Sequence, residues 1–557
     1  MTIKKSQNTC CKIFALAMVL SGLSTFSVAS SSDSADKKHF RIGISQYPTS
    51  VHRSFFRQTV AKYALNFTLR QPVYFDNQGQ LQCNSCISVP TLENGQARVV
   101  NRENGERGIA VTFRIKPDAR WGDGTPVTAD DFKLYWEIGR HPDTGANRSS
   151  WFKSIEKFEV IDDRAFTLYY KNAAYGYNNI SDLFPINSKL ERPIFESDPG
   201  NYRNNTLYKT EPTNVALWSG PYVLKSLTTG KEFILARNPH WQGKRPQFDE
   251  IALKVIENTS MMEANLLSGA VDMIGFGLQA DQGISFEKRH SRNYQVVYAE
   301  NVIVEYMDVN LDNRILADVR VRRALLHALN RDQANQLLFD GKQPPAIGIR
   351  PGENFERQYQ FDPERAIALL NEAGWTTLKK GIRHNSKGEP LQLEIATASG
   401  NKTRELLQQW MQGQFKQVGI DLRIRNQTAR VFFGETRKKR LFTGLSLQSG
   451  SVYPYWTYRN IFHSSAIPTP ENNYSGYNRG GYKSAEMDRL IEVQEAALLE
   501  TEFRQAELAI EELINEDLPS YLMFWKPRVT VIPRNLKGFR TPRFIGTSYW
   551  AEEWRWE

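Results

Sequence analysis

The sequence predicts a mixed α/β fold, because strand-like and helix-like segments alternate along the whole chain. The predicted strands are short and rich in β-branched and aromatic residues, and the predicted helices carry apolar residues three or four positions apart. No sustained heptad and no repeat of about 20–50 residues interrupts this alternation. A chain of 557 residues is long enough for two or three domains.

The first 29 residues have the pattern of a secretory signal peptide. A basic start holds Lys4, Lys5 and Lys12. Next come the apolar stretch 13–23 and the small residues 27–29, so we expect cleavage after about Ala29. The apolar stretch is shorter than the roughly 20 residues of a membrane span. Cys10 and Cys11 precede it, whereas a lipid-anchored protein needs a cysteine just after it. We therefore expect an exported, periplasmic protein that is not a lipoprotein.

The mature chain opens with predicted strands at 41–45 and 111–115, and a helix follows the turn at 122–126. Thr128 is a good N-cap for this helix. Asp131, three residues later, can complete a capping box.

Two later helices have equally clear signals. One begins at Asp362, with Pro363 in its first turn and Gly374 as its expected stop. The other spans about 319–329 and has apolar residues on one face.

The mature chain keeps two cysteines, Cys83 and Cys86, in a C-x-x-C spacing. In an oxidising compartment this spacing favours a local disulfide. A zinc site would need two further ligands close by, and the sequence supplies none. A thioredoxin-like redox pair would lie at the start of a helix, whereas the flanking residues indicate a turn and a strand.

The net charge is +10, but the basic residues are scattered, and the densest cluster is 437–440. A nucleic-acid-binding surface needs a basic stripe or face. We interpret the charge as a contribution to solubility and expect no nucleic-acid partner.

One segment imitates a cofactor-binding motif. Residues 271–280 contain G-x-G-x-x-A after a strand-like run, and Glu300 falls where a ribose-binding acid would lie. The intervening residues 281–293 lack a helical apolar stripe, and a true dinucleotide site needs a helix there. We therefore expect no cofactor.

Catalytic and metal-binding motifs are also missing from the sequence. The eight histidines are dispersed, without H-E-x-x-H or an i, i+4 pair, and no G-x-S-x-G is present. No pair of carboxylates is distinguished by its spacing. We expect neither a metal site nor an enzyme.

Five segments resemble, in order, the motifs of one known family. They are 113–132 with W-G-D-G-T-P-V-T-A-D-D, 219–224 with G-P-Y, 266–272 with L-L-S-G-A-V-D, 318–325 with D-V-R-V-R-R-A-L, and 362–375 with D-P-E-R-A and A-G-W. The family is the bacterial extracellular solute-binding proteins, family 5, which includes oligopeptide- and dipeptide-binding proteins. The similarity extends over roughly residues 40–530, and most of the matched residues form turns, caps and helix contacts.

The resemblance implies a two-lobed, periplasmic-binding-protein-like "Venus flytrap" of class II type with an extra inserted domain. Its expected parts are domain I at 38–67, 186–300 and 515–557, domain II at 68–185, and the second lobe at 301–514. The implied protein is a monomer that closes around a small, peptide-like solute without changing it. It then delivers the solute to an inner-membrane ABC permease with a cytoplasmic ATPase.

The sequence departs from the family at one informative position. Many peptide binders hold the α-ammonium of the ligand with an aspartate before an aromatic, proline-rich loop, and Ser451 aligns with that aspartate. No acid occurs from Phe442 to Pro470. Because a buried ammonium without a carboxylate is costly, either another acid such as Asp308 replaces it or the ligand has no free amino terminus.

The aligned segments imply a set of cleft residues. We expect the cleft to be lined by Tyr47, Tyr306, Gln448, Ser449, Gly450, Ser451, Tyr453 and Trp456, with Asp308 as the candidate acid. The aromatic side chains of 453–458 either stack on a sugar or other flat ring, or pack as part of the wall. A peptide-like solute is the leading expectation. An oligosaccharide or other polar solute, and a sensor or accessory role without transport, are the alternatives.

Overall fold

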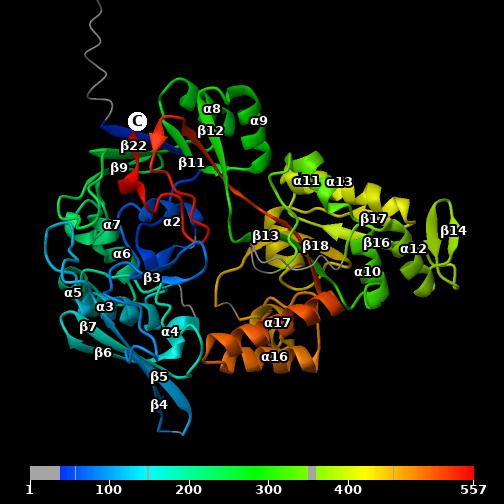
Figure 1. The fold of residues 1–557 in the computed structure, drawn as a ribbon, viewed down its shortest axis with the longest axis horizontal. Coiled ribbons are helices and arrows are strands. Elements are labelled where there is room, and N and C mark those ends of the chain that lie inside the picture. Colours follow the sequence, from blue (N-terminus) through cyan, green and yellow to red (C-terminus); the bar gives the residue numbers. More distant parts are fainter. Residues whose placement is uncertain (1–37, 57, 104, 147–149, 349–358, 456) are drawn as a thin grey trace, which may run out of the picture.

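The computed structural model describes residues 38–557 except 57, 104, 147–149, 349–358 and 456. The expected signal peptide and its cleavage site after Ala29 lie outside these residues, and so does Trp456. The described residues form two lobes side by side (Figure 1). Within them, no helix combines the length and apolar character needed to cross a membrane.

The first lobe contains a seven-stranded sheet. Its strands, in spatial order, are β12 (Tyr294–Ala299), β20 (Arg528–Pro533), β11 (Met273–Leu278), β1 (His39–Ile44), β10 (Glu250–Val255), β9 (Glu232–Arg237) and β8 (Tyr222–Thr228). The strand predicted at 41–45 is the central β1, which has parallel neighbours on both sides. Phe40 and Ile42 are fully buried, as expected for a strand in the middle of a sheet. The helices of this region are α2 (Thr59–Leu65), α8 (Thr259–Leu267) and α9 (Ala280–His290).

A four-stranded antiparallel sheet lies within residues 68–185, the segment expected to be the inserted domain. Its strands, in order, are β4 (Ala97–Asn101), β5 (Arg107–Arg114), β7 (Ala165–Tyr170) and β6 (Ile155–Asp162). The predicted helix after Thr128 is α3 (Ala129–Arg140), and its capping box is confirmed. The buried Asp131 carboxylate also accepts hydrogen bonds from Trp121 Nε1 at 3.0 Å and from the amide and hydroxyl of Ser188. One acid therefore holds together the turn, the start of α3 and the start of α5 (Ser188–Ser197).

The second lobe is built on a five-stranded sheet. Its strands, in order, are β17 (Asp421–Ile424), β16 (Gln392–Ala396), β18 (Leu445–Ser451), β13 (Ile303–Val309) and β19 (Ser520–Trp525). Its longer helices are α10 (Val319–His327), α11 (Arg331–Phe339), α12 (Pro363–Glu372), α13 (Lys402–Gln417), α16 (Ala485–Ala496) and α17 (Glu500–Asp517). The sheet includes β19, which lies beyond the boundary expected at residue 514, so the chain returns to the first lobe only at β20.

The predicted helix signals of this lobe agree with the structure. Asp362 caps α12 by accepting a hydrogen bond from the amide of Arg365 at 2.8 Å, and Pro363 occupies the first turn. Gly374 follows with a left-handed φ of +89°. Helix α10 ends at His327, two residues before the expected end.

The following elements make up the rest of the described chain. They are α4 (Ser150–Ser154), α5 (Ser188–Ser197), α6 (Tyr202–Asn205), α7 (Leu207–Thr210), α14 (Ala429–Val431), α15 (Arg459–Phe462), the pairs β2 (Val73–Phe75) with β3 (Leu81–Cys83), β14 (Thr377–Lys379) with β15 (Ile382–His384) and β21 (Leu536–Lys537) with β22 (Arg555–Trp556), and the single turns η1 (Arg53–Phe55), η2 (Val215–Leu217), η3 (Phe432–Thr436), η4 (Ser464–Ala466) and η5 (Ala551–Glu553).

Two extended segments join the lobes. Residues 300–302 connect β12 to β13, and residues 526–527 connect β19 back to β20. Both segments cross between the lobes (Figure 1), and the amide of Lys526 donates to the carbonyl of Ile303 at 2.9 Å. Such a paired connection is a typical hinge, because changes in a few backbone dihedral angles can reorient one lobe against the other.

The cofactor-like segment needs one correction. The expectation that no helix follows the strand at 273–278 is wrong, because α9 begins directly after β11. Its apolar face is formed by only a few buried residues, including Gly283, Ile284 and Phe286, which is too short a stripe to recognise in the sequence. Strand β20 lies between β11 and β12, and the carboxylate of Glu300 pairs with Arg543.

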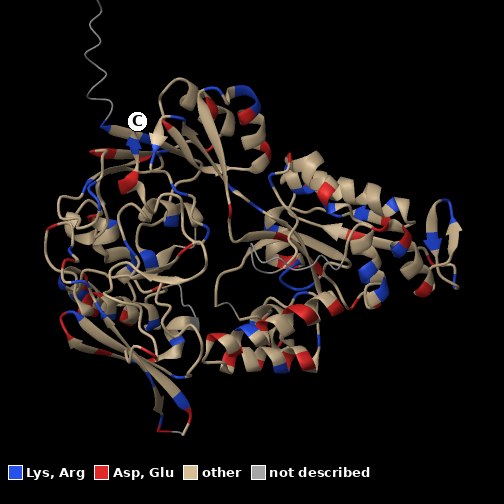
Figure 2. Ribbon diagram, in the orientation of Figure 1, with Lys and Arg blue, Asp and Glu red and all other residues tan. Residues whose placement is uncertain are grey.

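Figure 2 shows lysine and arginine distributed over both lobes and interspersed with acidic residues. The described part of the chain therefore presents a mixed surface. It agrees with the scattered basic residues of the sequence.

Candidate ligand-binding site

A cavity of about 340 Å³ lies where the two lobes meet at the hinge. Its wall includes the carboxyl ends of the parallel strands β1 and β11, at 45–46 and 276–279, and the hinge segments 301–303 and 526–529. The second lobe adds the end of β18 and the residues after it, and α2 lines the first-lobe side. Ligands of open α/β sheets bind outside the carboxyl ends of parallel strands, so this position is the expected one.

The two strand ends approach each other closely in this wall. Gly277 has a φ of +116°, and a Cβ added there would overlap Ser45 Oγ. Glycine is required because only it combines this backbone conformation with the missing side chain.

The cavity wall is basic. Lys62, Lys526 and Arg528 line it, and none of its described residues is Asp or Glu. The buried carboxylate of Glu305 lies behind the wall, where it is ion-paired with Arg404 and is 3.6 Å from Lys526 Nζ.

Within the described part of the chain, the Lys62 ammonium has neither a hydrogen bond nor an ion pair, and it lies 5.9 Å from the ring centre of Tyr453. Burial lowers the pKa of Lys62 to about 8, and the nearby positive charges of Arg53 and Arg528 contribute to this shift.

Arg528 is held by neutral groups. Its guanidinium donates to the carbonyl of Ile545 at 2.8 Å, to that of Pro542 at 3.2 Å and to Asn301 Oδ1 at 3.3 Å. Burial lowers its pKa. Because carbonyls orient the guanidinium without neutralising it, its positive charge acts on the cavity.

Asp308 belongs to a buried cluster behind this wall. Its carboxylate accepts hydrogen bonds from Arg437 Nε and from Gln448 Nε2, both at 3.0 Å. The Tyr306 hydroxyl accepts from Arg437 at 3.0 Å and from Gln448 at 2.6 Å. Burial raises the pKa of Asp308, and the Arg437 guanidinium opposes that rise. The carboxylate is therefore already paired within the protein.

The residues predicted from the sequence occupy different places. Ser449, Ser451 and Tyr453 line the cavity. Gly450 packs against the ring of Tyr306, where an added Cβ would lie 3.0 Å from Cε1. Tyr47 is not among the lining residues, because its ring stacks on Phe233 with centroids 5.1 Å apart.

The loop after β18 reaches the opposite lobe. The ring of Tyr455 packs against Phe75 at 5.2 Å and Tyr175 at 4.7 Å between centroids. At another point Lys288 forms a 3.4 Å ion pair with Asp340, which joins α9 to the end of α11. The lobes thus contact each other in two separate regions around the cavity.

A second hollow between the lobes is lined by both acidic and basic residues. It has a volume of about 430 Å³, lies between the inserted domain and α16, and is lined by Glu106, Glu492 and Glu495 as well as Arg107 and Arg459. Within the described residues, no three side chains of His, Cys, Asp or Glu are placed to hold a metal ion.

Comparison with known proteins establishes the family. The model of the bacterial extracellular solute-binding proteins, family 5, matches residues 102–467. The chain belongs to this family. The resemblance seen in its five motifs is thereby confirmed, as is the two-lobed α/β fold that this resemblance implied.

Three similar proteins show how far the similarity extends along the chain. The oligopeptide-binding protein AppA of Bacillus subtilis is 25% identical over 447 residues, which is 78% of each protein. The glutathione-binding protein GsiB of Salmonella typhi is 22% identical over 450 residues, covering 78% of this chain and 80% of the relative. The solved oligopeptide-binding protein of Thermus thermophilus, complexed with a pentapeptide, is 25% identical with a TM-score of 0.66, covering 94% of this chain and 96% of the other.

The sequence of this family 5 protein did not predict the three basic residues of the cavity. Lys62 is the only charged residue of the otherwise apolar helix α2, which is a usable signal. Lys526 and Arg528 flank Pro527 in the returning hinge segment, and nothing local distinguishes them. Only the tertiary fold brings these three residues to one cavity.

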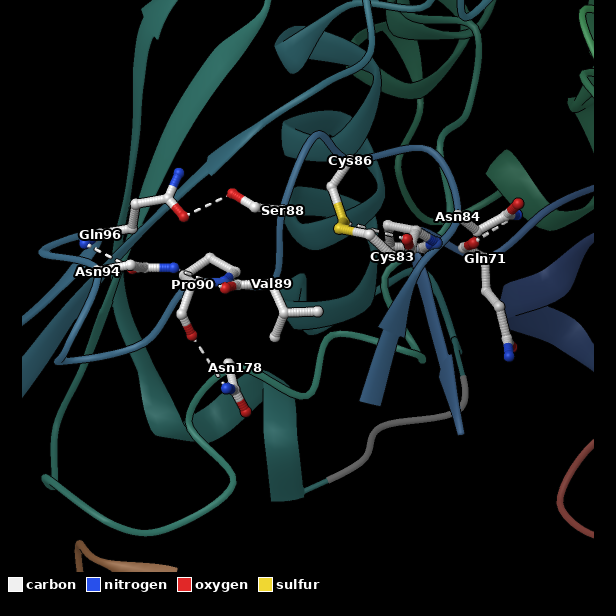
Figure 3. Close-up of a disulfide and its surroundings, with 11 residues drawn as sticks. Gln71, Cys83, Asn84, Cys86, Ser88, Val89, Pro90, Asn94, Gln96 and Asn178 are labelled. Atoms are coloured by element: carbon white, nitrogen blue, oxygen red, sulfur yellow. Dashed lines mark hydrogen bonds between the residues drawn. A yellow bond between two sulfur atoms is a disulfide. The ribbon is translucent and has the colours of Figure 1, made fainter. Parts of the chain in front are cut away.

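Neither of the two remaining cysteines is among the residues that line the cavity. Cys83 ends β3 and forms a disulfide with Cys86 in the following loop (Figure 3). No helix begins at either cysteine. The surrounding loop is held by side-chain amides, including Asn84 to the carbonyl of Gln71 at 3.0 Å.

His52 is buried and is not among the residues that line the cavity. Its Nδ1 accepts a hydrogen bond from the amide of Ser54 at 3.2 Å, and its Nε2 lies 3.2 Å from the Tyr202 hydroxyl. Burial lowers the pKa of His52 from 6.5 to about 3. Between these two pH values the unfolded chain binds a proton that the folded protein does not. The resulting stabilisation is therefore present above pH 6.5 and is lost as the pH falls towards 3.

We expect His52→Asn to reduce the loss of stability on acidification, because asparagine keeps an acceptor for the Ser54 amide but does not titrate. Between pH 6.5 and 3.5 the loss should shrink by about 2–4 kcal/mol, measured as urea unfolding at several pH values. His141→Asn is the matched control, since His141 Nδ1 accepts from the amide of Asp143 at a more exposed position. Equal pH profiles for wild type and His52→Asn would contradict the assignment.

Proposed function

We propose that this protein is the periplasmic substrate-binding component of an ABC importer, capturing a peptide or peptide-like solute between its lobes. The observation that carries the proposal is the hinge cavity, lined by polar and basic groups from both lobes. A solute that contacts both lobes stabilises their closed arrangement, because it gains those contacts only when the lobes meet.

The peptide-like nature of the solute rests on relatives. AppA and the Thermus protein are oligopeptide-binding proteins by name, and GsiB is a glutathione-binding protein. Polar residues at the end of β18, such as Ser449 and Ser451, offer hydrogen bonds of the kind that a peptide backbone satisfies.

Delivery follows from the same arrangement. The closed protein, acting as a monomer, presents both lobes at once to an inner-membrane permease, and the cytoplasmic ATPase drives release and uptake. The solute leaves unchanged, since the proposed role is binding without catalysis. Export through the segment 1–29 would bring the protein to the periplasm.

A polar non-peptide solute such as an oligosaccharide is the second candidate. The ring of Tyr453 lines the cavity and is 43% exposed, so it is available to stack on a sugar. Tyr455 does not favour this candidate, because its ring already packs on Phe75 and Tyr175.

Thermal-shift screening of the mature protein tests the proposal and separates the candidates. The probes are pools of free peptides, N-acetylated peptides and oligosaccharides. A ligand at 100 times its Kd adds about 2.7 kcal/mol of stability. We expect one of the peptide pools to raise Tm. Stabilisation by oligosaccharides alone would favour the second candidate, and no shift with any pool would contradict both.

A further inference from the structure

The charge of the cavity bears on the chemistry of its occupant. Four basic side chains, Lys62, Lys526, Arg528 and Arg404, lie in or directly behind the wall, and Glu305 is the carboxylate that pairs with two of them. Lys62 and Arg528 form no ion pair with any described residue. The cavity thus has a positive charge that the protein leaves without a counter-ion.

A partly buried ammonium without a partner is unfavourable for the ligand-free protein, because desolvation penalises its charged form. The depressed pKa of Lys62 is a consequence of this penalty. An anion that enters the cavity removes the penalty, so it binds more favourably than a neutral analogue of the same shape. A cationic group meets the reverse situation, since no acid lines the wall to receive it.

The chemistry of the two unpaired cations selects the anion. Lys62 and Arg528 both line the cavity, and both are donors without an acceptor function. A carboxylate supplies acceptors for the ammonium and the guanidinium together.

We propose that the solute binds through a carboxylate group placed between Lys62 on α2 and Arg528 on β20. This inference rests on the proposed function and narrows its solute to a peptide-like molecule with an anionic end in the hinge cavity. Any free ammonium of the solute lies outside this basic wall, since no described Asp or Glu lines it.

Three matched pentapeptide pools test the proposal by calorimetric titration of the mature protein. The first is N-acetylated with a free carboxylate, the second is N-acetylated with a C-terminal amide, and the third has a free amine and a C-terminal amide. The free-carboxylate pool should bind at least about 10-fold more tightly than either amide pool. Equal or tighter binding of an amide pool overturns the inference and leaves the proposed function standing. No binding by any pool contradicts the proposed function itself.

The variant Lys62→Met tests whether Lys62 causes the preference for a free carboxylate. We expect it to reduce the preference for the carboxylate to less than about 3-fold, while the ligand-free variant melts at or above the wild-type Tm. Lys225→Met is the control, because it removes the same charge from an exposed lysine paired with Glu250 and should keep the full preference. An unchanged preference in Lys62→Met overturns the proposal, and so does a lowered Tm, because it would indicate a structural role for the lysine.

The pH dependence provides an independent readout. Affinity for the free-carboxylate pool should fall as the pH rises from about 7 to about 9 in the wild type, because Lys62 loses its proton near pH 8. The charged groups that face Lys62 are Arg528 and the pair Arg53 with Asp182, and the neighbouring phenols are Tyr63 and Tyr453, whose pKa values burial raises. In Lys62→Met the fall should disappear. A fall of the same size in both proteins overturns the assignment to Lys62.

Discussion

Asp308→Ala is expected to lower the free energy of unfolding by about 3–5 kcal/mol, the cost of leaving a buried charge without its partner. The side chains of Asp308 and Arg437 are each only 6% exposed, so water cannot replace the missing carboxylate. Arg437 would keep only the Tyr306 hydroxyl of its two acceptors in this cluster. Urea denaturation followed by tryptophan fluorescence measures the loss.

Two further variants make this prediction specific. Asp312→Ala removes an acid that pairs with Arg440 but is 70% exposed, and it should cost less than about 1 kcal/mol. The double variant Asp308→Leu with Arg437→Met removes both partners of the pair, so most of the lost stability should return. A small loss in Asp308→Ala, similar to that of Asp312→Ala, would contradict the account of the buried pair.

Solute binding by Asp308→Ala, measured by calorimetric titration, decides between the two explanations for the aspartate that is missing at Ser451. If Asp308 held the ammonium of the ligand, its removal would weaken binding more than stability. The hydrogen bonds from Arg437 and Gln448 indicate the opposite, since they already occupy this carboxylate. The structure therefore favours a ligand without a free amino group at this end of the cavity.

Asp131→Ala is expected to cost about 3–5 kcal/mol and to loosen the whole inserted domain. This carboxylate accepts hydrogen bonds from the amides of Thr128 and Ser188, from the Ser188 hydroxyl and from Trp121 Nε1. Alanine leaves these buried donors without an acceptor and removes the capping box of α3.

Asp130→Ala is the control in the same turn of α3. Asp130 forms a 2.9 Å ion pair with Arg192 at a site that is 44% exposed on the acid side, so its loss should cost no more than about 1 kcal/mol. Hydrogen exchange of β5 and β7 would show whether the inserted domain is loosened. Equal effects of the two substitutions would contradict the central role of Asp131.

The sequence predicted the elements whose signals are local. The starts of two helices are marked within four residues, one by Thr128 and Asp131 and the other by Asp362 and Pro363. Both helices are present. Helix α9 was missed because its apolar face is short and includes a glycine. The boundary at residue 514 differs from the observed return at β20 because β19 joins the second lobe through long-range pairing with β13, which leaves no trace in local composition.

The candidate site was predicted only in part, for similar reasons. Ser449 and Ser451 line the cavity, because the segment that aligns with the family's cleft residues ends at this cavity. Tyr47 follows β1 into the first lobe, where Phe233 offers a stacking partner that the sequence does not reveal. Lys62 and Arg528 are far apart in the chain, and their shared cavity arises only when β20 returns beside β11.

A crystal structure of the mature protein saturated with the best-binding solute tests the central claim most directly. The account predicts electron density for an unmodified solute in the hinge cavity, contacting groups of both lobes, with an anionic group at Lys62 and Arg528. Density for the solute on one lobe alone, or a hinge cavity filled only with water at saturation, would contradict it.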